Sequence, residues 1–415
     1  SLRPRGERKP GGQKGHPGHT LKSVEHPDHT VVHRVDECDK CHAPLGDERP
    51  TGVHKRQVFD VPPPPGLEST EHQAETKSCP HCGHVNQAAF PEGVNAPVQY
   101  GPRVKAIAVY LRQYQLLPSQ RTCELLSDFF SCELSEGTLA NILKAADHLL
   151  AEPVAEIARQ ITAAPVAHFD ETGCSVNARR QWLHVACTDK LTYYQVHRKR
   201  GTEAMDHIGI LPKFTGRAIH DHWKPYLTYL CDHGLCNAHH LRELVFVHEE
   251  HAQRWAEHMI ECLLAIKETV DEARSTTDRL SEEQIRGFEA DYQRILDEGY
   301  AENPLPTPPP GKKKRGRRKK TKPRNLLERL DDYRKETLAF MYDFNVPFDN
   351  NQGERDIRMV KVQQKISGTF RSQAGANAFC RARSYISTVR KHALNVIEGI
   401  LGVFMRKAFV PPGPG

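Results

Sequence analysis

The chain has 415 residues, of which 38% are hydrophobic and 27% charged, and its net charge is +6 at pH 7. This length indicates about two to four domains and is ample for a buried core. No uncharged apolar run approaches the roughly 18–20 residues of a membrane helix, and the basic start contains no apolar signal segment. We therefore expect a soluble protein that is neither membrane-embedded nor secreted. The sequence begins at Ser1 rather than Met, so a missing upstream segment is one alternative.

The positive charge is concentrated in two segments. Residues 1–23 carry six Lys/Arg against one acid, and residues 311–324 carry ten Lys/Arg and no acid, so the rest of the chain is net negative. Such runs suit nucleic-acid backbones because binding releases counterions, although a solvated linker is the alternative. The cations that we expect to contact DNA here are Arg3, Arg5, Arg8, Lys9, Lys14, Lys312, Lys313, Lys314, Arg315, Arg317, Arg318, Lys319 and Lys320.

The first hundred residues contain an arm followed by two cysteine pairs. Residues 1–30 are rich in Gly, Pro and His, which predicts an extended arm. Residues 31–98 hold two C-x-x-C pairs, with runs of strand character at 30–35 and 53–61 and a Pro-rich turn between the pairs. We expect residues 31–98 to form a small metal-binding module.

Four cysteines in that module have the spacing of zinc ligands. Two C-x-x-C knuckles supply four thiolates for one tetrahedral Zn²⁺, and in an intracellular protein metal is favoured over disulfides. A closed site of four ligands is structural, because it leaves no open position for catalysis. Unpaired cysteines are the alternative, and three nearby histidines are rival ligands: His42, His81 and His84. The predicted zinc ligands are Cys38, Cys41, Cys79 and Cys82.

Residues 99–160 have helical periodicity. Ser135 looks like an N-cap, since an apolar face with a 3.6-residue period follows it. Two short helices within 121–147, joined by residues 131–134, fit a helix-turn-helix that binds DNA. A plain helical bundle fits equally well.

From residue 161 onward the pattern is that of a mixed α/β core. Three apolar runs at short spacing predict a strand meander, followed by a helix at 202–209 and a further strand that ends at Asp221. Residues 241–344 are helical apart from a Pro-rich and then basic linker, and a last helical region covers roughly 350–405. The sequence therefore predicts an α/β core interrupted by an all-α insertion at 241–344.

Three acids on different predicted elements suggest a divalent-metal site. Asp170 and Asp221 each end a predicted strand, and Glu354 lies in the first turn of a predicted helix. Carboxylates at the ends of neighbouring strands can hold hard cations for phosphoryl chemistry. Arg358 and Lys361 share the helix face of Glu354, which suits contact with a phosphate backbone. Helix caps or surface salt bridges are the alternative for each acid taken singly.

Several segments in order resemble one transposase family. The chain resembles the insertion-sequence 66 family of transposases through the N-terminal KPGGQKGHPGHTL, the paired knuckles, FDETG at 169–173, RQWLHVACT at 180–188, IHDHWKPYL at 219–227, CNAHHLREL at 236–244 and VPFDNNQGERDIRMVKVQQKISGTFRS at 346–372. One local departure is Cys174, where a bulky aromatic residue is expected. The chain also lacks the upstream coiled coil that members of this family often carry.

The resemblance implies a ribonuclease H-like catalytic core with an Asp-Asp-Glu triad. By position these residues are Asp170, Asp221 and Glu354, and the core comprises 161–240 and 345–405. Two Mg²⁺ (or Mn²⁺) ions held by the triad are expected to serve cleavage at transposon ends and transfer of the 3′ hydroxyl ends to target DNA.

The resemblance also implies partners and a location. We expect DNA as the partner, through the transposon terminal repeats and target DNA. We also expect a homodimer or larger assembly in a bacterial cytoplasm near the nucleoid, with co-encoded helper proteins as a further option.

Two other functions stay open: a metal-dependent nuclease of the same fold, and a non-enzymatic zinc protein that regulates by binding DNA. Joined DNA products distinguish the transposase from the nuclease, and metal-dependent cleavage of any kind distinguishes both from the regulator.

A C-x-x-H pair follows the second acid. Cys236 and His239 are expected to support the fold or to position DNA, with an ordinary helix-start Cys and a buried His as the alternative. Trp182 and Trp223 are most simply core residues, although Trp223 has a base-stacking role as an alternative.

Overall fold

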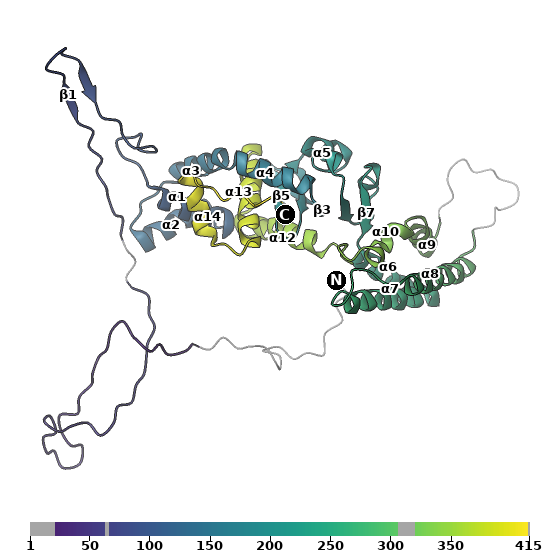
Figure 1. The fold of residues 1–415 in the computed structure, drawn as a ribbon, viewed down its shortest axis with the longest axis horizontal. Coiled ribbons are helices and arrows are strands. Elements are labelled where there is room, and N and C mark those ends of the chain that lie inside the picture. The colour runs from purple at the N-terminus through teal and green to yellow at the C-terminus, as the bar shows by residue number, and fades with distance from the viewer. Residues whose placement is uncertain (1–20, 63–65, 306–319, 414–415) are drawn as a thin grey trace. The chain divides into compact units, whose positions relative to one another are not determined.

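The computed structural model describes residues 21–62, 66–305 and 320–413. The chain divides into two units, residues 1–65 and residues 66–415, and each is described by itself. In the described part, no helix is both long and apolar enough to cross a membrane. Figure 1 shows the chain coloured by residue number.

The described residues of the first unit form an extended, exposed segment. Its regular pairing within 21–62 is one antiparallel bridge, between Glu37 and Pro44. The strands predicted at 30–35 and 53–61 are therefore wrong. Their valines lie exposed, because no neighbouring strand in the described part of this unit pairs with them and no core there covers them.

The second unit begins with a small hairpin and continues into helices. Strands β1 (Thr76–Ser78) and β2 (Val85–Gln87) are antiparallel. The helices that follow are α1 (Pro102–Val109), which continues as a π-helical turn (Tyr110–Tyr114), α2 (Ser119–Phe130), α3 (Glu136–Leu149) and α4 (Ala151–Thr162). The predicted cap of α3 is confirmed, since the Ser135 side chain accepts a hydrogen bond from the backbone N–H of Thr138.

The apolar faces of α1, α2 and α3 form one core with the C-terminal helix α14 (Val396–Phe404). Leu126, Leu139 and Ile142 lie in this core beside Ile400 and Leu401. Residues 119–149 do form two helices joined by a tight turn, with Ser131 in the left-handed conformation. Since α3 also packs on α13, one face of it is occupied by protein. DNA recognition by this pair stays a prediction.

A five-stranded mixed sheet follows, in the order β5-β4-β3-β6-β7. Strands β3, β4 and β5 are antiparallel neighbours, whereas β6 runs parallel to β3 and β7 runs parallel to β6. The predicted meander and the strand before Asp221 are confirmed; β7 was not predicted. The bounds are β3 (Val166–Val176), β4 (Arg179–Cys187), β5 (Thr192–His197), β6 (Arg217–His220) and β7 (Asp232–Leu235).

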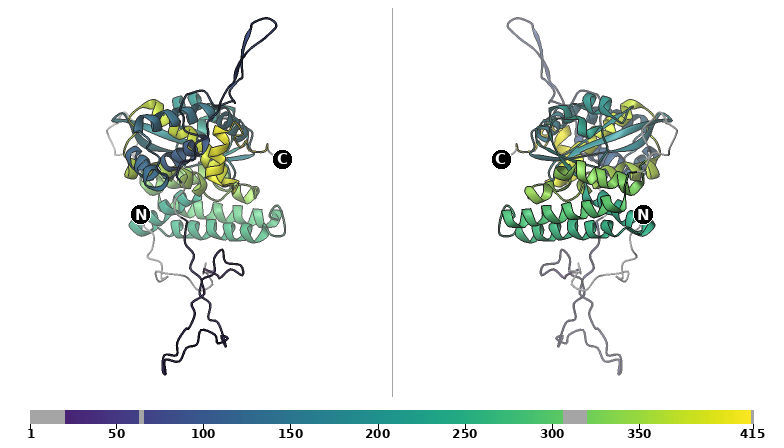
Figure 2. Two further views of the ribbon diagram at one scale, coloured as in Figure 1. Left: turned by 90° about the vertical axis from the view of Figure 1, so that its left-hand side faces the viewer. Right: turned by 90° about the vertical axis from the view of Figure 1, so that its right-hand side faces the viewer.

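Helices cover this sheet, as Figure 2 shows. Helix α12 (Asn351–Ser367) packs on β3 and β4, and α13 (Gln373–Lys391) packs on β5. Short elements between the strands are the predicted helix α5 (Thr202–Ile208) and two 3₁₀ turns, Leu211–Lys213 and Tyr226–Thr228. Helix α12 thus brings a segment from late in the sequence onto strands formed from residues 166–187.

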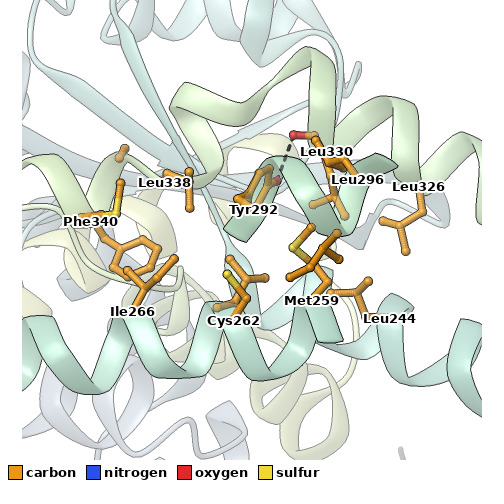
Figure 3. Close-up of a cluster of buried hydrophobic side chains, with 14 of the residues drawn as sticks. Leu244, Met259, Cys262, Ile266, Tyr292, Leu296, Leu326, Leu330, Leu338 and Phe340 are labelled. Atoms are coloured by element: carbon orange, nitrogen blue, oxygen red, sulfur yellow. Dashed lines mark hydrogen bonds between the residues drawn. The ribbon is translucent and has the colours of Figure 1, made fainter. Parts of the chain in front are cut away.

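Between β7 and α12 the chain forms a set of helices with their own core. The long helices α7 and α8 lie side by side (Figures 1 and 2). Figure 3 shows their buried side chains, with the Tyr292 hydroxyl donating to the Leu330 carbonyl at 2.9 Å. The helices are α6 (Asn237–His251), α7 (Arg254–Ala273), α8 (Glu282–Glu302), α9 (Lys322–Asp332), α10 (Arg334–Thr337) and α11 (Ala339–Tyr342). This core reaches the sheet through Ile219 and Val346.

Candidate active site

Asp170 lies within β3 rather than at its end. The strand continues from Asp170 to Val176, because its residues pair with β4 as far as the Val176–Arg179 pair. The predicted strand end at Asp170 is therefore wrong. The Asp170 carboxylate accepts a hydrogen bond from the backbone N–H of Glu171 at 2.8 Å and is partly buried.

Asp221 directly follows β6, as predicted. Its Oδ1 accepts a hydrogen bond from the backbone N–H of Trp223 at 3.0 Å, which fixes the turn after the strand. The parallel register of β3 and β6 pairs His168 with Ile219. Two residues further along each strand are Asp170 and Asp221, so the topology brings the two acids to neighbouring positions.

Glu354 lies in the first turn of α12, as predicted. The residue before this helix, Asn350, is buried, and its side chain bonds to β3 instead of capping its own helix. Its Oδ1 lies 2.8 Å from His168 Nδ1, and its Nδ2 donates to the Phe169 carbonyl at 2.9 Å. Helix α12 is thus fastened to the two strand residues that precede Asp170.

The glycine at position 353 lies close to the Asn350 side chain. A Cβ at Gly353 would lie 3.0 Å from the Asn350 Oδ1 atom, closer than side chains ordinarily approach. A larger residue would therefore push against the side chain that joins α12 to β3. Gly353 directly precedes Glu354, so this close approach helps to set the backbone position from which the Glu354 side chain extends.

The carboxyl group of Asp170 responds to burial and to the acids around it. Burial raises the pKa of Asp170 to about 7, with the neighbouring Glu171 as the next cause and Asp221 and Glu354 adding to it. Negative charge around a buried carboxyl is what a bound cation would offset, and the oxygen-only donor set fits a hard divalent metal. The oxygen atoms of the three acids do not all lie within 4.8 Å of one another in this structure. The Glu354 carboxylate itself points toward cations of α6, with Oε1 3.4 Å from Arg242 Nη2.

Sequence reasoning missed the role of Glu171. This side chain is buried, and Arg200 binds its Oε1 through Nε at 2.8 Å and Nη2 at 2.6 Å. The Tyr226 hydroxyl donates to the other carboxylate oxygen. Burial raises the pKa of Glu171. The signal in the sequence was an acid within an apolar strand, because a buried carboxylate needs hydrogen-bonding or charged partners. Its partner Arg200 lies too far along the chain to be inferred from the sequence.

A groove with an open volume of about 700 Å³ follows the part of β3 after Asp170, and its lining includes Glu171, Trp182 and Lys361 but none of the three acids. Arg200 lies between the two tryptophans, 4.9 Å from the Trp182 ring centre and 3.9 Å from that of Trp223. Arg180 covers Trp182 at 4.8 Å. Both tryptophans are only partly buried, and Trp223 packs against buried core residues as well as against Arg200. Lys361, at the groove edge, donates to the Gly173 carbonyl at 2.6 Å.

Each cysteine knuckle has local geometry suited to a thiolate. Backbone N–H groups of Lys40 and Cys41 lower the pKa of Cys38. Around the second knuckle, N–H groups of Cys82 and His81 lower the pKa of Cys79. Thiolates are the form that binds metal.

Both knuckles turn tightly through positive backbone angles. His42 has φ of 56° and Gly83 has φ of 72°. The backbone N–H of Gly83 donates to the Cys79 carbonyl at 2.9 Å, and that of His42 donates to the Cys38 carbonyl at 2.9 Å. Each knuckle is therefore a closed turn within its own unit.

Comparison with protein families assigns the chain. Residues 97–378, more than half of the chain, match the family described as "Transposase IS66 family". The chain belongs to the IS66 family of transposases. Residues 36–83 of this transposase match the zinc-finger binding domain of transposase IS66, a region that contains both knuckles. The search of curated proteins found no match.

The cations of the transposase that were predicted to contact DNA fall into two groups. Arg358 and Lys361 lie exposed on α12. Lys320 is partly buried in an ion pair with Glu328 on α9, so it is less free for DNA than predicted. The others lie outside the described residues: Arg3, Arg5, Arg8, Lys9, Lys14, Lys312, Lys313, Lys314, Arg315, Arg317, Arg318 and Lys319.

The C-x-x-H pair of the transposase lies against Glu354. Cys236 is buried, and burial raises the pKa of its thiol to about 11. Its Sγ accepts a hydrogen bond from the backbone N–H of Asn350 at 3.1 Å. His239 Nδ1 lies 3.8 Å from Glu354 Oε1. The pair therefore lies at the junction between α6 and α12, and its supporting role stays a prediction.

Proposed function

We propose that this IS66 family transposase cleaves DNA at transposon ends and transfers the 3′ hydroxyl ends to target DNA, using Asp170, Asp221 and Glu354. The observation that carries the proposal is the convergence of these acids from β3, the end of β6 and the start of α12. The carboxylates of Asp221 and Glu354 both raise the pKa of Asp170, which supports a shared site. A nuclease that cuts without joining would use the same acids, and membership in the family favours the transposase.

The sheet order supports a ribonuclease H-like core. Three antiparallel strands followed by two parallel ones, with α12 returning to β3, fit such a core built from 161–240 and 345–405. The helices between β7 and α12 then form an insertion, 241–344. We place a basic arm at 1–30, a zinc module at 31–98 and a helical DNA-binding region at 99–160.

Asp170, Asp221 and Glu354 would hold Mg²⁺ or Mn²⁺. When bound, two such cations supply Lewis-acid stabilisation of the attacking and leaving oxygens in phosphoryl transfer. The fit rests on the oxygen-only donor set and on the gathered negative charge around Asp170. Asn350 and the β3–β6 register hold the three side chains in position for that task.

The groove beside the acids would hold the DNA strand. Its wall combines the Trp182 ring with the guanidinium groups of Arg180 and Arg200, and such surfaces bind bases by stacking and phosphates by charge. Lys361 adds a cation at the edge. Arg200 of this wall also stacks on Trp223, whose backbone N–H is hydrogen-bonded to Asp221, so the second acid is linked to the wall through these two residues.

The zinc module would bind the terminal repeats together with the arm. Its predicted ligands are Cys38, Cys41, Cys79 and Cys82, and the match to the family's zinc-finger domain supports zinc there. Metal analysis of the full chain should show zinc that is lost in the Cys79→Ser and Cys82→Ser variants. Unchanged zinc content in both variants would exclude these cysteines as ligands.

The experiment is a strand-transfer assay on the full chain. Purified protein is incubated with Mg²⁺ or Mn²⁺, labelled DNA from the ends flanking its gene, and a plasmid target. The native protein should give joined products, and Asp170→Asn, Asp221→Asn and Glu354→Gln should give none while still binding DNA. Asp189→Asn, an exposed acid in the turn after β4, is the matched control and should join normally.

Other outcomes point elsewhere. Full strand transfer by Asp221→Asn would overturn the triad. Cleavage without joining would favour the nuclease, and DNA binding with no metal-dependent chemistry would favour the regulator.

A further inference from the structure

Three ligand types meet where α6 and α12 begin. Cys236 directly precedes α6, His239 lies in its first turn, and Glu354 lies in the first turn of α12. One thiol, imidazole and carboxylate atom from these residues all lie within 4.8 Å of one another. Across the described ranges, no other group of three such side chains is this close. The Asp-Asp-Glu acids themselves are not such a group.

The sulfur of Cys236 is surrounded as a metal-binding sulfur would be. The backbone N–H of Asn350 donates to it at 3.1 Å, and the backbone N–H of His239 donates to the Cys236 carbonyl at 3.0 Å. Backbone N–H groups play the same part at Cys38 and Cys79. Two helix N-termini also face this point, and their dipoles oppose the effect of burial, which raises the pKa of the Cys236 thiol.

The imidazole of His239 has a nitrogen in need of a partner. Its Nδ1 is buried and makes no hydrogen bond to any described residue. The nearest acceptor, Glu354 Oε1, is 3.8 Å away, too far for a hydrogen bond. Glu354 is also approached by Arg242 Nη2 at 3.4 Å, and this weak interaction would have to loosen for Glu354 to serve as a ligand. A cation between the imidazole and the carboxylate would satisfy both.

We propose that Cys236, His239 and Glu354 bind a zinc-class transition-metal ion, and that this ion competes with catalytic Mg²⁺ for Glu354. The second half rests on the proposed function. Sulfur, nitrogen and oxygen donors with one open position suit Zn²⁺, whereas Mg²⁺ takes oxygen ligands. On binding, the Cys236 thiol releases its proton to solvent and its sulfur forms the bond to zinc. The ion would join α6 to α12 and withdraw Glu354 from the triad.

The test is zinc stoichiometry of the full chain, measured by competition with a chromophoric chelator. All proteins compared here keep the four knuckle cysteines, so zinc bound by the knuckles contributes equally to every sample. Cys236→Ser and His239→Ala should each lose one equivalent relative to the native protein. His239 is partly exposed, so its variant should fold even if Cys236→Ser does not. Cys123→Ser, a half-buried thiol on α2, is the matched control and should lose none.

Cobalt gives a second readout. Co²⁺ added to the native chain should produce a sulfur-to-metal absorption band that is weaker in Cys236→Ser and unchanged in Cys123→Ser. Equal zinc content and equal cobalt spectra in native and Cys236→Ser protein would overturn the site.

The competition is tested separately. Zinc should inhibit Mg²⁺-dependent cleavage by the native protein, and the zinc concentration required should rise by about tenfold or more in His239→Ala. Equal zinc sensitivity in both would overturn the competition while leaving the site. A chain that cleaves under no condition would contradict the proposed function, and the stoichiometry would still decide the metal site.

Discussion

Asn350 connects three parts of the candidate active site through one short residue. Its side chain bonds to His168 and to the Phe169 carbonyl on β3, and its backbone N–H bonds to Cys236. These hydrogen bonds set the position from which Glu354 extends. The segment looks like a helix cap in the sequence, yet the side chain bonds to distant residues instead.

Replacing Asn350 should therefore damage both stability and activity. Asn350→Ala leaves His168 and the Phe169 carbonyl without partners in a buried place, so we expect the free energy of unfolding to fall by about 2–4 kcal/mol. Urea denaturation measures this, and metal-dependent cleavage should fall as well. Asn351→Ala is the control, because Asn351 is exposed and its side chain bonds only to Asp349 among the described residues. Equal stability of the two variants would contradict this role.

The raised pKa of Asp170 predicts pH-dependent metal binding. Its pKa is about 7 in the folded metal-free protein and about 3.8 when unfolded, so its stabilising effect is present below pH 3.8 and is lost as the pH rises through 7. Added Mg²⁺ should offset the resulting repulsion. The rise in melting temperature on adding Mg²⁺ should therefore be larger at pH 8 than at pH 6. Asp170→Asn should show a small rise at both pH values; a rise equal to that of the native protein would contradict the assignment.

At the scale of elements, the strands were predictable where apolar runs are long. β3, β4 and β5 follow such runs, and β6 ends at Asp221 as expected. β7 was missed because Asp232–Leu235 is short and contains Gly234. The end of β3 was misplaced because Glu171, Thr172 and Gly173, which line the groove, interrupt the apolar run. Pairing partners, which decide such cases, are not encoded locally.

The basic segment 311–324 gives a prediction at the same scale. Changing Lys312, Lys313 and Lys314 to Gln should weaken DNA binding and reduce the slope of log affinity against log salt by about 0.9 for each DNA phosphate that is no longer neutralised. Fluorescence anisotropy over a salt series measures this slope. Lys190→Gln, an exposed lysine in the turn before β5, should leave it unchanged. An unchanged slope in the triple variant would remove the segment from the DNA interface.

Across the whole molecule, buried histidines make folding sensitive to acid. Burial lowers the pKa of His184 to about 4 and those of His220 and His240 to about 3. Their contribution to stability is complete above the unfolded pKa of 6.5 and is lost as the pH falls toward the folded values. Asp170 and Glu171, whose pKa values are raised, oppose this trend.

We therefore expect the free energy of unfolding to decrease between pH 6.5 and pH 4.5. Each buried histidine contributes up to about 1.4 kcal/mol per pH unit. Urea denaturation across this range measures the slope, and His184→Gln should make it shallower. His251→Gln, at an exposed site, should not change it. Identical slopes in the native protein and His184→Gln would contradict the assignment.

The sequence allowed the residues of the candidate site to be predicted, but not the contacts that join them. Asp221 and Glu354 were placed correctly relative to their elements, and the knuckles follow from cysteine spacing alone. The bonds of Glu171 to Arg200 and of Asn350 to β3 join residues far apart in the chain. Such hydrogen bonds depend on which strands pair and on the packing of α12 against β3, and a local sequence pattern predicts neither. The orientation of Glu354 toward α6 is of the same kind.

The return of α12 to β3 also sets the order in which a ribosome can complete the site. Asp170 and Asp221 leave the exit tunnel together with their strands, but Glu354 follows only after all the helices between β7 and α12 have been made. At about 5–20 residues per second, that interval is roughly 7–27 s. A nascent or prematurely terminated chain therefore carries two acids without the third. Under the proposed function, such a chain would lack one of the three acids on which DNA cleavage depends.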